Sequence, residues 1–388
     1  MRYRKLGKTN LDVSILGFGA MRLPMAGNHG PMAGFDPNVP IDEIEATKMI
    51  NHALEHGVNY FDTAYGYHGG KSEAFLGKVL RQYRTKVLIA TKLPVWNLEK
   101  PEDMEKILNE QLTRLDTDYL DFYLVHGLGA NTWPKAKGLD VLKFLDGLRA
   151  SGRIRYAGFS FHDDIKVFKD IIGSYDWDMC QIQYNFYDQN YQAGKEGLAY
   201  AASRGIGVVV MEPLRGGKLV DKIPQAIQAL WDGAPVKRSP AEWAMRWVWN
   251  HPEVSTALTG ASSLAQLKDH TGIIKDAEPG SLTSEELSVF SQVQAAYRKM
   301  LKVDCTACAY CMPCPSGVNI PQNFQLYNDT FLFPNPEMNA FFYNHMLNPE
   351  QRGSGCSECL ECVEKCPQKI DIPKELKNVH QKLGEKQQ

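Results

Sequence analysis

Residues 86–125 read KVLIATKLPVWNLEKPEDMEKILNEQLTRLDTDYLDFYLV. Two short apolar runs, 86–91 and 119–125, enclose a segment, 101–115, whose apolar residues recur at the spacing of a helix. A strand, a helix and a second strand in this order are typical of parallel sheets covered by helices. The stretch therefore predicts one βαβ unit of an α/β fold.

The same alternation continues over most of the first 280 residues. Further strand-like runs occupy six segments: 15–18, 58–61, 155–160, 179–184, 205–211 and 254–259. Eight strands separated by helical segments over about 250 residues predict a (β/α)8 TIM barrel. A doubly wound sheet is the alternative, but no G-x-G-x-x-G motif follows an early strand. We therefore expect a barrel.

Eight of the nine cysteines form two short motifs near the C-terminus. The motifs are C-x2-C-x2-C-x2-C-P and C-x2-C-x2-C-x3-C-P, and their cysteines are Cys305, Cys308, Cys311, Cys314, Cys356, Cys359, Cys362 and Cys366. The second motif has the bacterial iron–sulfur spacing, and the first is one residue shorter before its last cysteine. The segments that follow, PSGVNIP and PQKIDIP, are also alike, which indicates a duplicated module. We expect these cysteines to bind iron–sulfur clusters.

Zinc and disulfide bonds are the alternatives for these cysteines. A zinc ribbon needs only two cysteines per turn, so a third at the same step is surplus to it. Disulfides are disfavoured because the start, MRYRKLGKTNLDVS, has no apolar signal segment, and cysteines this close would pair with strain. The ninth cysteine, Cys180, lies in an apolar strand-like run and is interpreted as a small buried apolar residue.

The chain of 388 residues is too long for one small domain, and a barrel of about 250 residues plus a second part of about 90 would fit. A capping-box pattern at 283–286 predicts a helix that runs toward Lys299, just before the first cysteine motif. We therefore divide the chain into a barrel (1–280), a linking helix (281–300) and a small C-terminal iron–sulfur domain (301–388).

The composition is that of an ordinary globular protein, with 44% hydrophobic and 23% charged residues. A net charge of -2 gives no general attraction to nucleic acid or to an anionic membrane. No segment approaches the roughly 18 consecutive apolar residues of a membrane span. We expect a cytoplasmic protein with neither a nucleic-acid nor a membrane partner.

Ionisable residues stand at the ends of three successive strand-like runs. They are Asp62, Lys92 and His126, and Tyr67 lies in the loop that follows Asp62. Each of the first three, taken singly, also fits a cap or a solvated strand end. Barrel active sites, however, are built at the carboxyl ends of the strands. The combination at equivalent strand ends therefore predicts an active site on that rim.

These positions resemble the signature regions of the aldo–keto reductase family. The matching segments are FDTAYGY (61–67), IATKL (89–93) and DYLDFYLVHG (118–127), and the start, 4–23, is similar to the family's N-terminal hairpin and first strand. The resemblance covers residues 1 to about 275 and implies an enzyme acting on a small-molecule carbonyl or alcohol. It implies three roles for the four residues: Tyr67 is the proton donor, Lys92 and Asp62 form the pair that tunes it, and His126 orients the substrate carbonyl.

The chemistry of carbonyl reduction agrees with these roles. The developing alkoxide needs a proton, and a free tyrosine with a pKa near 10 is a weak acid at neutral pH. An adjacent ammonium favours the phenolate, so we expect Lys92 to lower the pKa of Tyr67 toward the working range. A histidine can hydrogen-bond the carbonyl oxygen. Tyr65 is the rival proton donor, but the pattern D-T-A-x-x-Y favours Tyr67.

The resemblance also implies a nicotinamide cofactor, NADP or NAD, in an extended pose across the barrel. It implicates Ser160, Gln183, Met211, Pro213, Leu214, Gly216, Gly260, Ser262 and Gln266. Backbone N–H groups at the start of the helix after Gly260 would hold phosphate. Without the resemblance, ordinary loop closure would be the simpler interpretation of the glycines.

Several positions depart from the family pattern. Met211 replaces a tyrosine that stacks on nicotinamide, and Phe161 and His270 replace asparagines. Only Lys268 lies near the place where an Arg/Lys pair would mark a 2′-phosphate site. NADP and NAD therefore both stay open.

The cysteine motifs are similar to those of bacterial two-cluster ferredoxins. The resemblance implies two [4Fe–4S] clusters, or at least one, with crossed ligands. One cluster would use Cys305, Cys308, Cys311 and Cys366, and the other Cys356, Cys359, Cys362 and Cys314. The shortened first motif leaves the first cluster and the crossing open.

Carbonyl reduction does not require these clusters, because hydride carries two electrons and a [4Fe–4S] centre exchanges one. Two roles for the clusters are open. They transfer electrons between the barrel and a ferredoxin-like partner or an unusual substrate, or they only stabilise the small domain. In a third interpretation the chain is an electron-transfer or redox-sensing protein whose barrel binds nicotinamide without turnover. The complete set of acid, phenol, amine and imidazole favours an enzyme.

Overall fold

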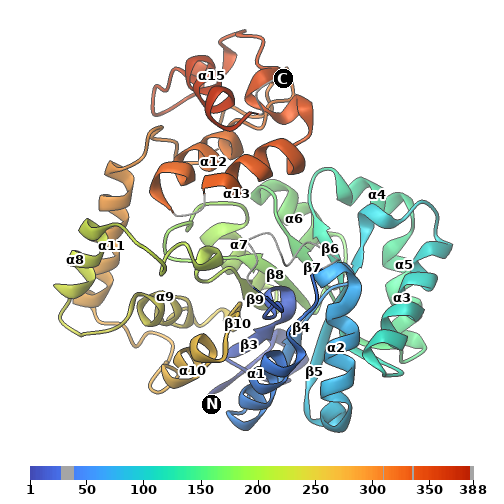
Figure 1. The fold of residues 1–388 in the computed structure, drawn as a ribbon. Coiled ribbons are helices and arrows are strands. Elements are labelled where there is room, and N and C mark those ends of the chain that lie inside the picture. Colours follow the sequence, from blue (N-terminus) through green and yellow to red (C-terminus); the bar gives the residue numbers. More distant parts are fainter. Residues whose placement is uncertain (28–38, 309, 334–335, 385–388) are drawn as a thin grey trace. The chain divides into compact units, whose positions relative to one another are not determined.

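A computed structural model describes residues 1–27, 39–308, 310–333 and 336–384 (Figure 1). The chain forms two compact units. The first comprises Met1–Gly216 and Ala241–Thr283, and the second Gly217–Pro240 and Ser284–Gln388. Residues 28–38, most of the Gly- and Pro-rich segment 24–40, lie outside the described residues.

Eight parallel strands close into a barrel in the first unit, which confirms the predicted TIM barrel (Figure 1). They are β3 (Leu16–Gly19), β4 (Tyr60–Asp62), β5 (Leu88–Pro94), β6 (Leu120–Leu128), β7 (Ile154–Phe161), β8 (Met179–Gln183), β9 (Gly207–Met211) and β10 (Val254–Thr259). Each strand pairs with the next along the chain, and β10 pairs with both β9 and β3. Their carboxyl ends therefore form one rim.

A short antiparallel hairpin, β1 (Tyr3–Lys5) and β2 (Asp12–Ser14), precedes the barrel. Its apolar residues Leu6 and Val13 are fully buried and share a core cluster with side chains of the barrel strands, among them Tyr60, Phe122 and Met179. The Lys8 backbone N–H donates to the carbonyl of Gly205, just before β9 begins. The hairpin thus packs at the amino-terminal end of the strands, away from the rim that carries the predicted site.

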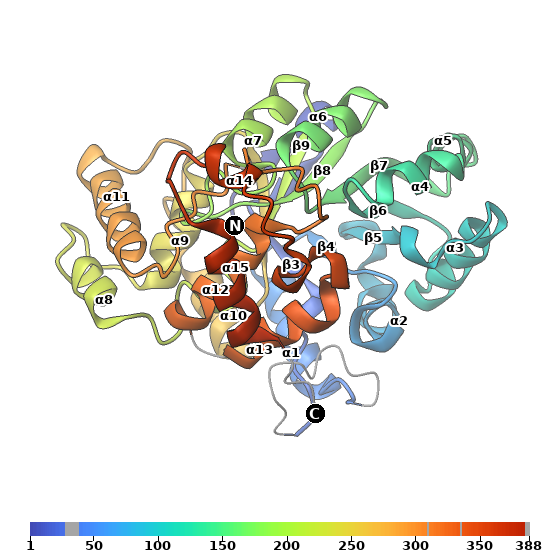
Figure 2. The same cartoon turned by 90° about the horizontal axis from the view of Figure 1, so that it is seen from above.

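The helices of the first unit lie outside the ring of strands (Figure 2). They are α1 (Glu43–Glu55), α2 (Lys71–Leu80), α3 (Glu102–Leu115), α4 (Thr132–Gly138), α5 (Val141–Ala150), α6 (Ile165–Gly173), α7 (Gly194–Ser203), α9 (Pro240–Trp249) and α10 (Leu264–Gly272). α3 shows why they form: Met104, Ile107, Leu108 and Leu115 recur at helical spacing and are buried. The same buried face also carries a polar residue, Gln111.

The second unit is helical over its described residues. Its helices are α8 (Gln225–Asp232), α11 (Ser284–Lys299), α12 (Ile320–Leu332), α13 (Pro336–Phe341), α14 (Glu361–Glu364) and α15 (Ile372–Leu383). The duplicated module appears in the helix starts, because Asn319 caps α12 and Asp371 caps α15, each just before an Ile-Pro pair. A small apolar core contains Val318, Phe324 and Leu376.

The boundaries proposed from the sequence differ from the two units at the linking helix, which the second unit includes from Ser284 on, and at one segment inside the barrel half. Residues 217–240, which include α8, belong to the second unit together with α11. Trp231 of α8 packs edge-on against Phe290 of α11, with ring centres 5.3 Å apart. A boundary at residue 280 divides the chain into consecutive segments, whereas the two units group residues that pack together.

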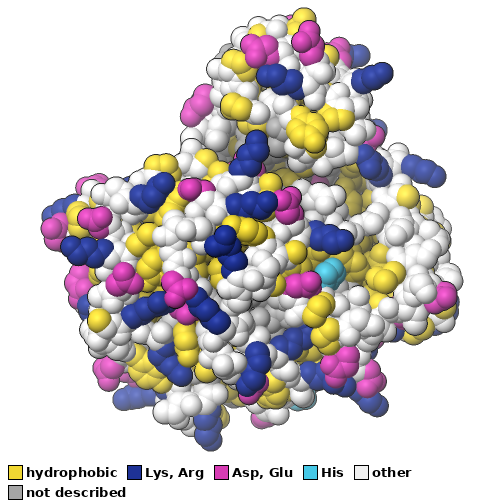
Figure 3. Space-filling model, turned by 180° about the vertical axis from the view of Figure 1, so that it is seen from behind, with side chains coloured by type: hydrophobic (Ala, Val, Ile, Leu, Met, Phe, Trp, Pro, Cys, Tyr) yellow, Lys and Arg dark blue, Asp and Glu magenta, His cyan; other side chains and the backbone are white. Residues whose placement is uncertain are grey.

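The surface is mixed in charge. On the face shown in Figure 3, acidic and basic side chains are interspersed, as the net charge of -2 leads one to expect. Of the helices described, none combines the length and the apolar character that crossing a membrane would require.

Candidate active site

The four predicted catalytic residues lie on one rim of the barrel. Asp62 ends β4, and Lys92 and His126 lie near the ends of β5 and β6. Tyr67 opens a 3-10 turn, Tyr67–Gly70, after β4. Because β4, β5 and β6 are parallel neighbours, their carboxyl ends bring these side chains together.

A buried ion pair joins Asp62 and Lys92. Lys92 Nζ donates to Asp62 Oδ1 and to the Thr63 carbonyl, each at 2.7 Å, and the two side chains are 3% and 1% exposed. Burial alone would lower the pKa of Lys92, but the charges of Asp62 and Tyr67 outweigh it and the pKa is raised. Burial raises the pKa of Asp62, and Lys92 opposes that shift. Lys92 is therefore an ammonium at neutral pH.

Tyr67 lies against this ammonium, with Lys92 Nζ 5.1 Å from the centre of its ring. Burial raises the pKa of Tyr67 above its ordinary value, and the charge of Lys92 opposes the shift. The sequence predicts a lowered pKa for Tyr67 from the positive charge of Lys92, but in the structure the loss of solvent raises the pKa by more than that charge lowers it. Tyr67 is thus a neutral phenol at pH 7, the protonation state that a proton donor needs.

His126 faces Tyr67 edge-on, with ring centres 6.1 Å apart. Trp96, itself 54% exposed, contacts the imidazole with a ring separation of 4.8 Å. Burial lowers the pKa of His126 well below its ordinary value, and the charges of Lys92 and His162 lower it further. Nδ1 is buried and has no hydrogen-bond partner in the described part of the chain. The imidazole is therefore neutral, with one N–H available for a carbonyl oxygen.

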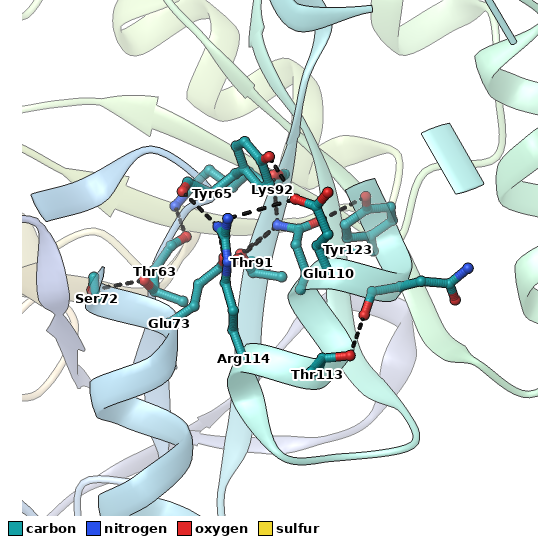
Figure 4. A network of polar contacts seen from close by, with 12 residues as sticks. Thr63, Tyr65, Ser72, Glu73, Thr91, Lys92, Glu110, Thr113, Arg114 and Tyr123 are labelled. Atoms are coloured by element: carbon teal, nitrogen blue, oxygen red, sulfur yellow. Dashed lines mark hydrogen bonds and ion pairs between the residues drawn. The ribbon is translucent and has the colours of Figure 1, made fainter. Parts of the chain in front are cut away.

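Tyr65, the rival proton donor, points elsewhere. Its hydroxyl donates to Glu110 Oε2 at 2.7 Å, and the guanidinium of Arg114 lies 4.4 Å from its ring centre (Figure 4). The hydrogen bond to Glu110 is the main cause that raises the pKa of Tyr65. Tyr65 is held by α3, so Tyr67 is the tyrosine beside Lys92.

Three predicted cofactor residues continue around the rim on the next strands. Ser160 lies on β7, Gln183 ends β8 and Met211 ends β9. Ser160 Oγ accepts from the backbone N–H of Gly127 at 2.8 Å, so its own hydrogen is free to donate. Gln183 Nε2 donates to Asp188 Oδ2 at 3.0 Å, which fixes the orientation of its amide.

The remaining predicted cofactor residues lie in two loops. Pro213 and Leu214 form a turn after β9, and Gly216 follows with a φ of 67°, a value that favours glycine. Gly260 and Ser262 are exposed between β10 and α10. The side chain of Gln266 accepts from the Ser262 backbone N–H at 2.9 Å. A phosphate held by that N–H would therefore have to take the place of Gln266.

Arg22 connects the two loops and was not among the residues predicted from the sequence. Its Nη1 donates to the Gly216 carbonyl at 3.3 Å, and a Cβ on Gly260 would lie 3.5 Å from its Cδ. It stands in the short turn Ala20–Arg22, directly after β3. A cation just after the first strand, on the active rim, is a sequence signal that could have found it.

The eight clustered cysteines surround two separate hollows in the second unit. The first is lined by Cys305, Cys308, Cys311 and Cys366. The second is lined by Cys314, Cys356, Cys359 and Cys362. Each hollow thus takes three cysteines from one motif and one from the other, the grouping that the ferredoxin resemblance implies.

The donor chemistry of these hollows fits a cluster better than a single ion. Apolar side chains complete the walls, with Ile320 shared by both hollows and Phe324 and Ile372 in the first. Among the described residues, no three Cys, His, Asp or Glu side chains are arranged to hold one metal ion. Four thiols spread around a hollow suit a multi-iron cluster, whereas zinc requires its sulfur ligands to converge on one point.

Cys180 lies apart from these hollows. It is fully buried on β8, and burial raises the pKa of its thiol. A buried thiol of this kind is unreactive, which agrees with its interpretation as a small apolar residue.

Comparison with known proteins covers both units of the chain. Residues 16–288 match the model of the aldo/keto reductase family, and residues 304–371 match the model of a 4Fe-4S dicluster domain. The oxidoreductase YqkF of Bacillus subtilis, described as uncharacterized, is 27% identical, over 74% of this chain and 94% of its own length. L-galactose dehydrogenase of Arabidopsis thaliana is 26% identical, over 74% and 92%.

A solved structure gives the same result. The holo form of aldo-keto reductase AKR11C1 from Bacillus halodurans superimposes with a TM-score of 0.61 at 27% identity. The match covers 76% of this chain and 96% of that one.

Proposed function

The chain belongs to the aldo/keto reductase family, and on that premise we propose that it is an NAD(P)H-dependent oxidoreductase that interconverts a carbonyl and an alcohol by hydride transfer. The observation that carries the proposal is the buried ammonium of Lys92, paired with Asp62 and placed against the ring of Tyr67. Burying two charges has a high desolvation penalty. A protein that only binds a nucleotide has no use for such a pair beside a phenol.

The residues act together on the proton. Tyr67 donates it to the oxygen of the developing alkoxide, and in the reverse direction takes it back. The phenolate that forms lies beside Lys92, whose positive charge stabilises it, and Asp62 keeps that charge in place. The neutral His126 donates a hydrogen bond to the carbonyl oxygen, so that negative charge develops next to a prearranged donor.

We propose the predicted strand ends and loops as the cofactor site, for NADP or NAD. Bound nicotinamide would supply the hydride. Ser160, Gln183 and Met211 would hold its ring and carboxamide. Phosphate groups would lie across the loops that contain Pro213, Leu214, Gly216, Gly260, Ser262 and Gln266, beside the guanidinium of Arg22.

We also propose two [4Fe–4S] clusters with crossed ligands, one in each cysteine hollow. Their first role would be to stabilise the second unit, because five of the eight cysteines pack against its small apolar core and a sixth, Cys362, is part of it. Electron exchange with a ferredoxin-like partner is the second candidate role. It is favoured by the exposure of Cys308 and Cys359, one at each hollow.

Two matched tyrosine variants test the reductase proposal. Tyr67→Phe should lower kcat for carbonyl reduction by about 100-fold or more, the usual effect of a general acid. Tyr65→Phe removes a hydroxyl only two residues away, which is bound to Glu110, and should keep kcat near the wild-type value. Equal rates for Tyr67→Phe and the wild type would contradict the proposal. The measurement is NAD(P)H consumption with a panel of aldehydes and ketones.

Iron analysis tests the cluster proposal. Anaerobically purified protein should contain about eight iron atoms per chain, four for each cluster. Zinc in place of iron, or only about four irons, would overturn the proposal of two clusters.

A further inference from the structure

We propose that Glu73 is a positioning residue for the reaction: its buried carboxylate fixes the strand that carries Lys92 to the turn that carries Tyr67. The inference rests on the proposed function and adds a residue whose importance the sequence did not reveal.

One oxygen of Glu73 holds β5. Glu73 lies in the first turn of α2 and is 0% exposed. Its Oε1 accepts from Thr91 Oγ1 at 2.6 Å and from Gln111 Nε2 at 2.7 Å. Thr91 directly precedes Lys92, and the same Gln111 Nε2 donates to the backbone carbonyl of Lys92 at 3.0 Å. Glu73 thus holds the chain around Lys92 at two points: directly at the side chain of Thr91, and through Gln111 at the carbonyl of Lys92.

The other oxygen of Glu73 holds the turn. Oε2 is 3.2 Å from Arg114 Nη1, which also donates to the backbone carbonyl of Tyr65 at 3.2 Å. The guanidinium of Arg114 lies over the ring of Tyr65 as well. Tyr65 is two residues before Tyr67, so Arg114 anchors the start of the segment that delivers the phenol. Figure 4 shows Tyr65, Glu73, Thr91 and Arg114 in one network of polar contacts.

The arrangement requires a carboxylate at this position. Gln111 cannot turn its amide, because its Nε2 faces the Lys92 carbonyl, which can only accept, at 3.0 Å. Gln111, Thr91 and Arg114 therefore all present donors to Glu73. A glutamine at position 73 would offer one accepting oxygen and would direct its NH2 group at another donor. Burial raises the pKa of Glu73, and these three partners oppose the shift.

The consequence concerns the distance between Lys92 and Tyr67. The two residues come from different elements, β5 and the turn after β4, and Glu73 connects their backbones through Gln111 and Arg114. A misplacement of about 1 Å at reacting groups can reduce a rate by about 100-fold. Loss of the carboxylate should therefore affect kcat and leave cofactor binding, which uses other strands and loops, almost unchanged.

The test compares Glu73→Gln with Asp121→Asn in the full-length, cluster-containing protein. Asp121 is a matched control, because it is also a buried carboxylate paired with arginine. Its partners are Arg84 and Arg155, and it also holds β5, by accepting from the Ile89 N–H. Ile89 and Asp121 lie at the opposite end of β5 and β6 from the active rim. A purely structural role predicts the same behaviour for both variants.

We expect Glu73→Gln to lower kcat at least about tenfold, with the KM for NAD(P)H within about twofold of wild type, and to shift the pH profile of kcat. Asp121→Asn should lower the unfolding midpoint but keep kcat and its pH profile. If Glu73→Gln also loses only stability, the proposal is wrong. If Glu73→Gln does not fold, Arg114→Lys tests the link to Tyr65, and an unchanged kcat in that variant would overturn the proposal.

A second readout separates this inference from the proposed function. The pKa of the Tyr67 phenol can be measured without turnover, from the difference between absorbance titrations of the wild type and Tyr67→Phe. Glu73→Gln should change that pKa, whereas Asp121→Asn should not. Should the wild type reduce no carbonyl, the proposed function fails, yet an altered Tyr67 titration would still support the positioning role and an unaltered one would refute it.

Discussion

Replacing Asp62 by Asn should show how strongly the barrel depends on the charge of one buried carboxylate. Asparagine has the same shape, and its carbonyl oxygen can still accept from Lys92 Nζ, which lies 2.7 Å from Asp62 Oδ1. The change removes the negative charge and leaves the ammonium with neutral acceptors, among them the Thr63 carbonyl at 2.7 Å. It therefore isolates the charge from the hydrogen bond.

The size of the effect follows from the burial of the pair. Removal of one member of a buried ion pair destabilises a protein by about 3–5 kcal/mol. Because Lys92 keeps the Thr63 carbonyl, we expect the lower end, about 3 kcal/mol in the free energy of unfolding. Lys92 can relieve this strain by losing its proton, and about 3 kcal/mol corresponds to about 2 pKa units. Without the charge of Asp62, burial becomes the larger effect, so the pKa of Lys92, raised in the wild type, should fall below the ordinary lysine value.

The stability difference between the wild type and Asp62→Asn should depend on pH. In the wild type the folded pKa of Lys92 lies above the unfolded value of about 10.4, so its contribution to stability is complete below that pH and is lost as pH rises through the folded pKa. In the variant the folded pKa lies below the unfolded one, so the penalty is complete at pH 7 and shrinks toward pH 10. Urea unfolding at both pH values, followed by tryptophan fluorescence, measures the difference.

Two outcomes would refute this reasoning. One is a wild-type-to-variant difference below about 1 kcal/mol at pH 7, the value of an exposed pair. The other is a difference that is the same at pH 7 and pH 10. The control is Asp62→Asn combined with Lys92→Met, which removes both charges. It should be more stable than Asp62→Asn alone, because an uncompensated buried charge no longer remains.

Three further predictions follow from the site. Burial keeps the pKa of His126 well below 6.5, so protonation of this histidine should not lower kcat between pH 8 and pH 6.5. A fall of kcat in that range that is absent in His126→Gln would contradict the geometry. Cys314→Ser should alter the EPR signal of the cluster held by the second motif, and Cys366→Ser that of the first, whereas the reverse assignment would exclude crossed ligands. Arg22→Ala should raise the Kd for NADPH or NADH about tenfold, because a charge-assisted contact worth about 1.4 kcal/mol is lost. An unchanged Kd in a fluorescence titration would show that Arg22 does not contact the cofactor.

Much of the fold could be predicted because its signals are local. The strand-like runs are continuous and apolar, as expected where both faces of a parallel sheet are covered, and the ends of β4, β5 and β6 follow from them. Once these ends were placed, Asp62, Lys92 and His126 had to share a rim. The cysteine motifs are equally local, since their spacing alone indicates a cluster.

The parts that escaped prediction depend on side-chain direction and on solvent. The spacing of Tyr65 and Tyr67 gives no physical reason to prefer one, and only the structure shows that Glu110 holds Tyr65. The raised pKa of Tyr67 reflects burial that no sequence pattern reports. Glu73 and Gln111 look like ordinary polar residues on surface helices, although both are fully buried.

The association of residues 217–240 with the second unit was also invisible in the sequence. The segment lies between two barrel elements, β9 and α9, and its helix α8 is a short amphipathic stretch like many others. Its partner is α11, more than 50 residues further along the chain. Long-range packing of this kind is set by which apolar faces meet, here Trp231 with Phe290, and single-sequence periodicity does not encode that choice.

The exchange of cysteines between the two hollows interlocks the halves of the duplicated module. A chain cut between Pro315 and Gly355 would divide both ligand sets, because Cys366 belongs to the hollow of the first motif and Cys314 to that of the second. The amino-terminal fragment would keep three thiols for one hollow and a single thiol for the other, and the carboxy-terminal fragment the converse. With the proposed crossed clusters, neither half alone would hold a complete set of four cysteine ligands, and both sets would be complete only after ribosomal synthesis has passed residue 366.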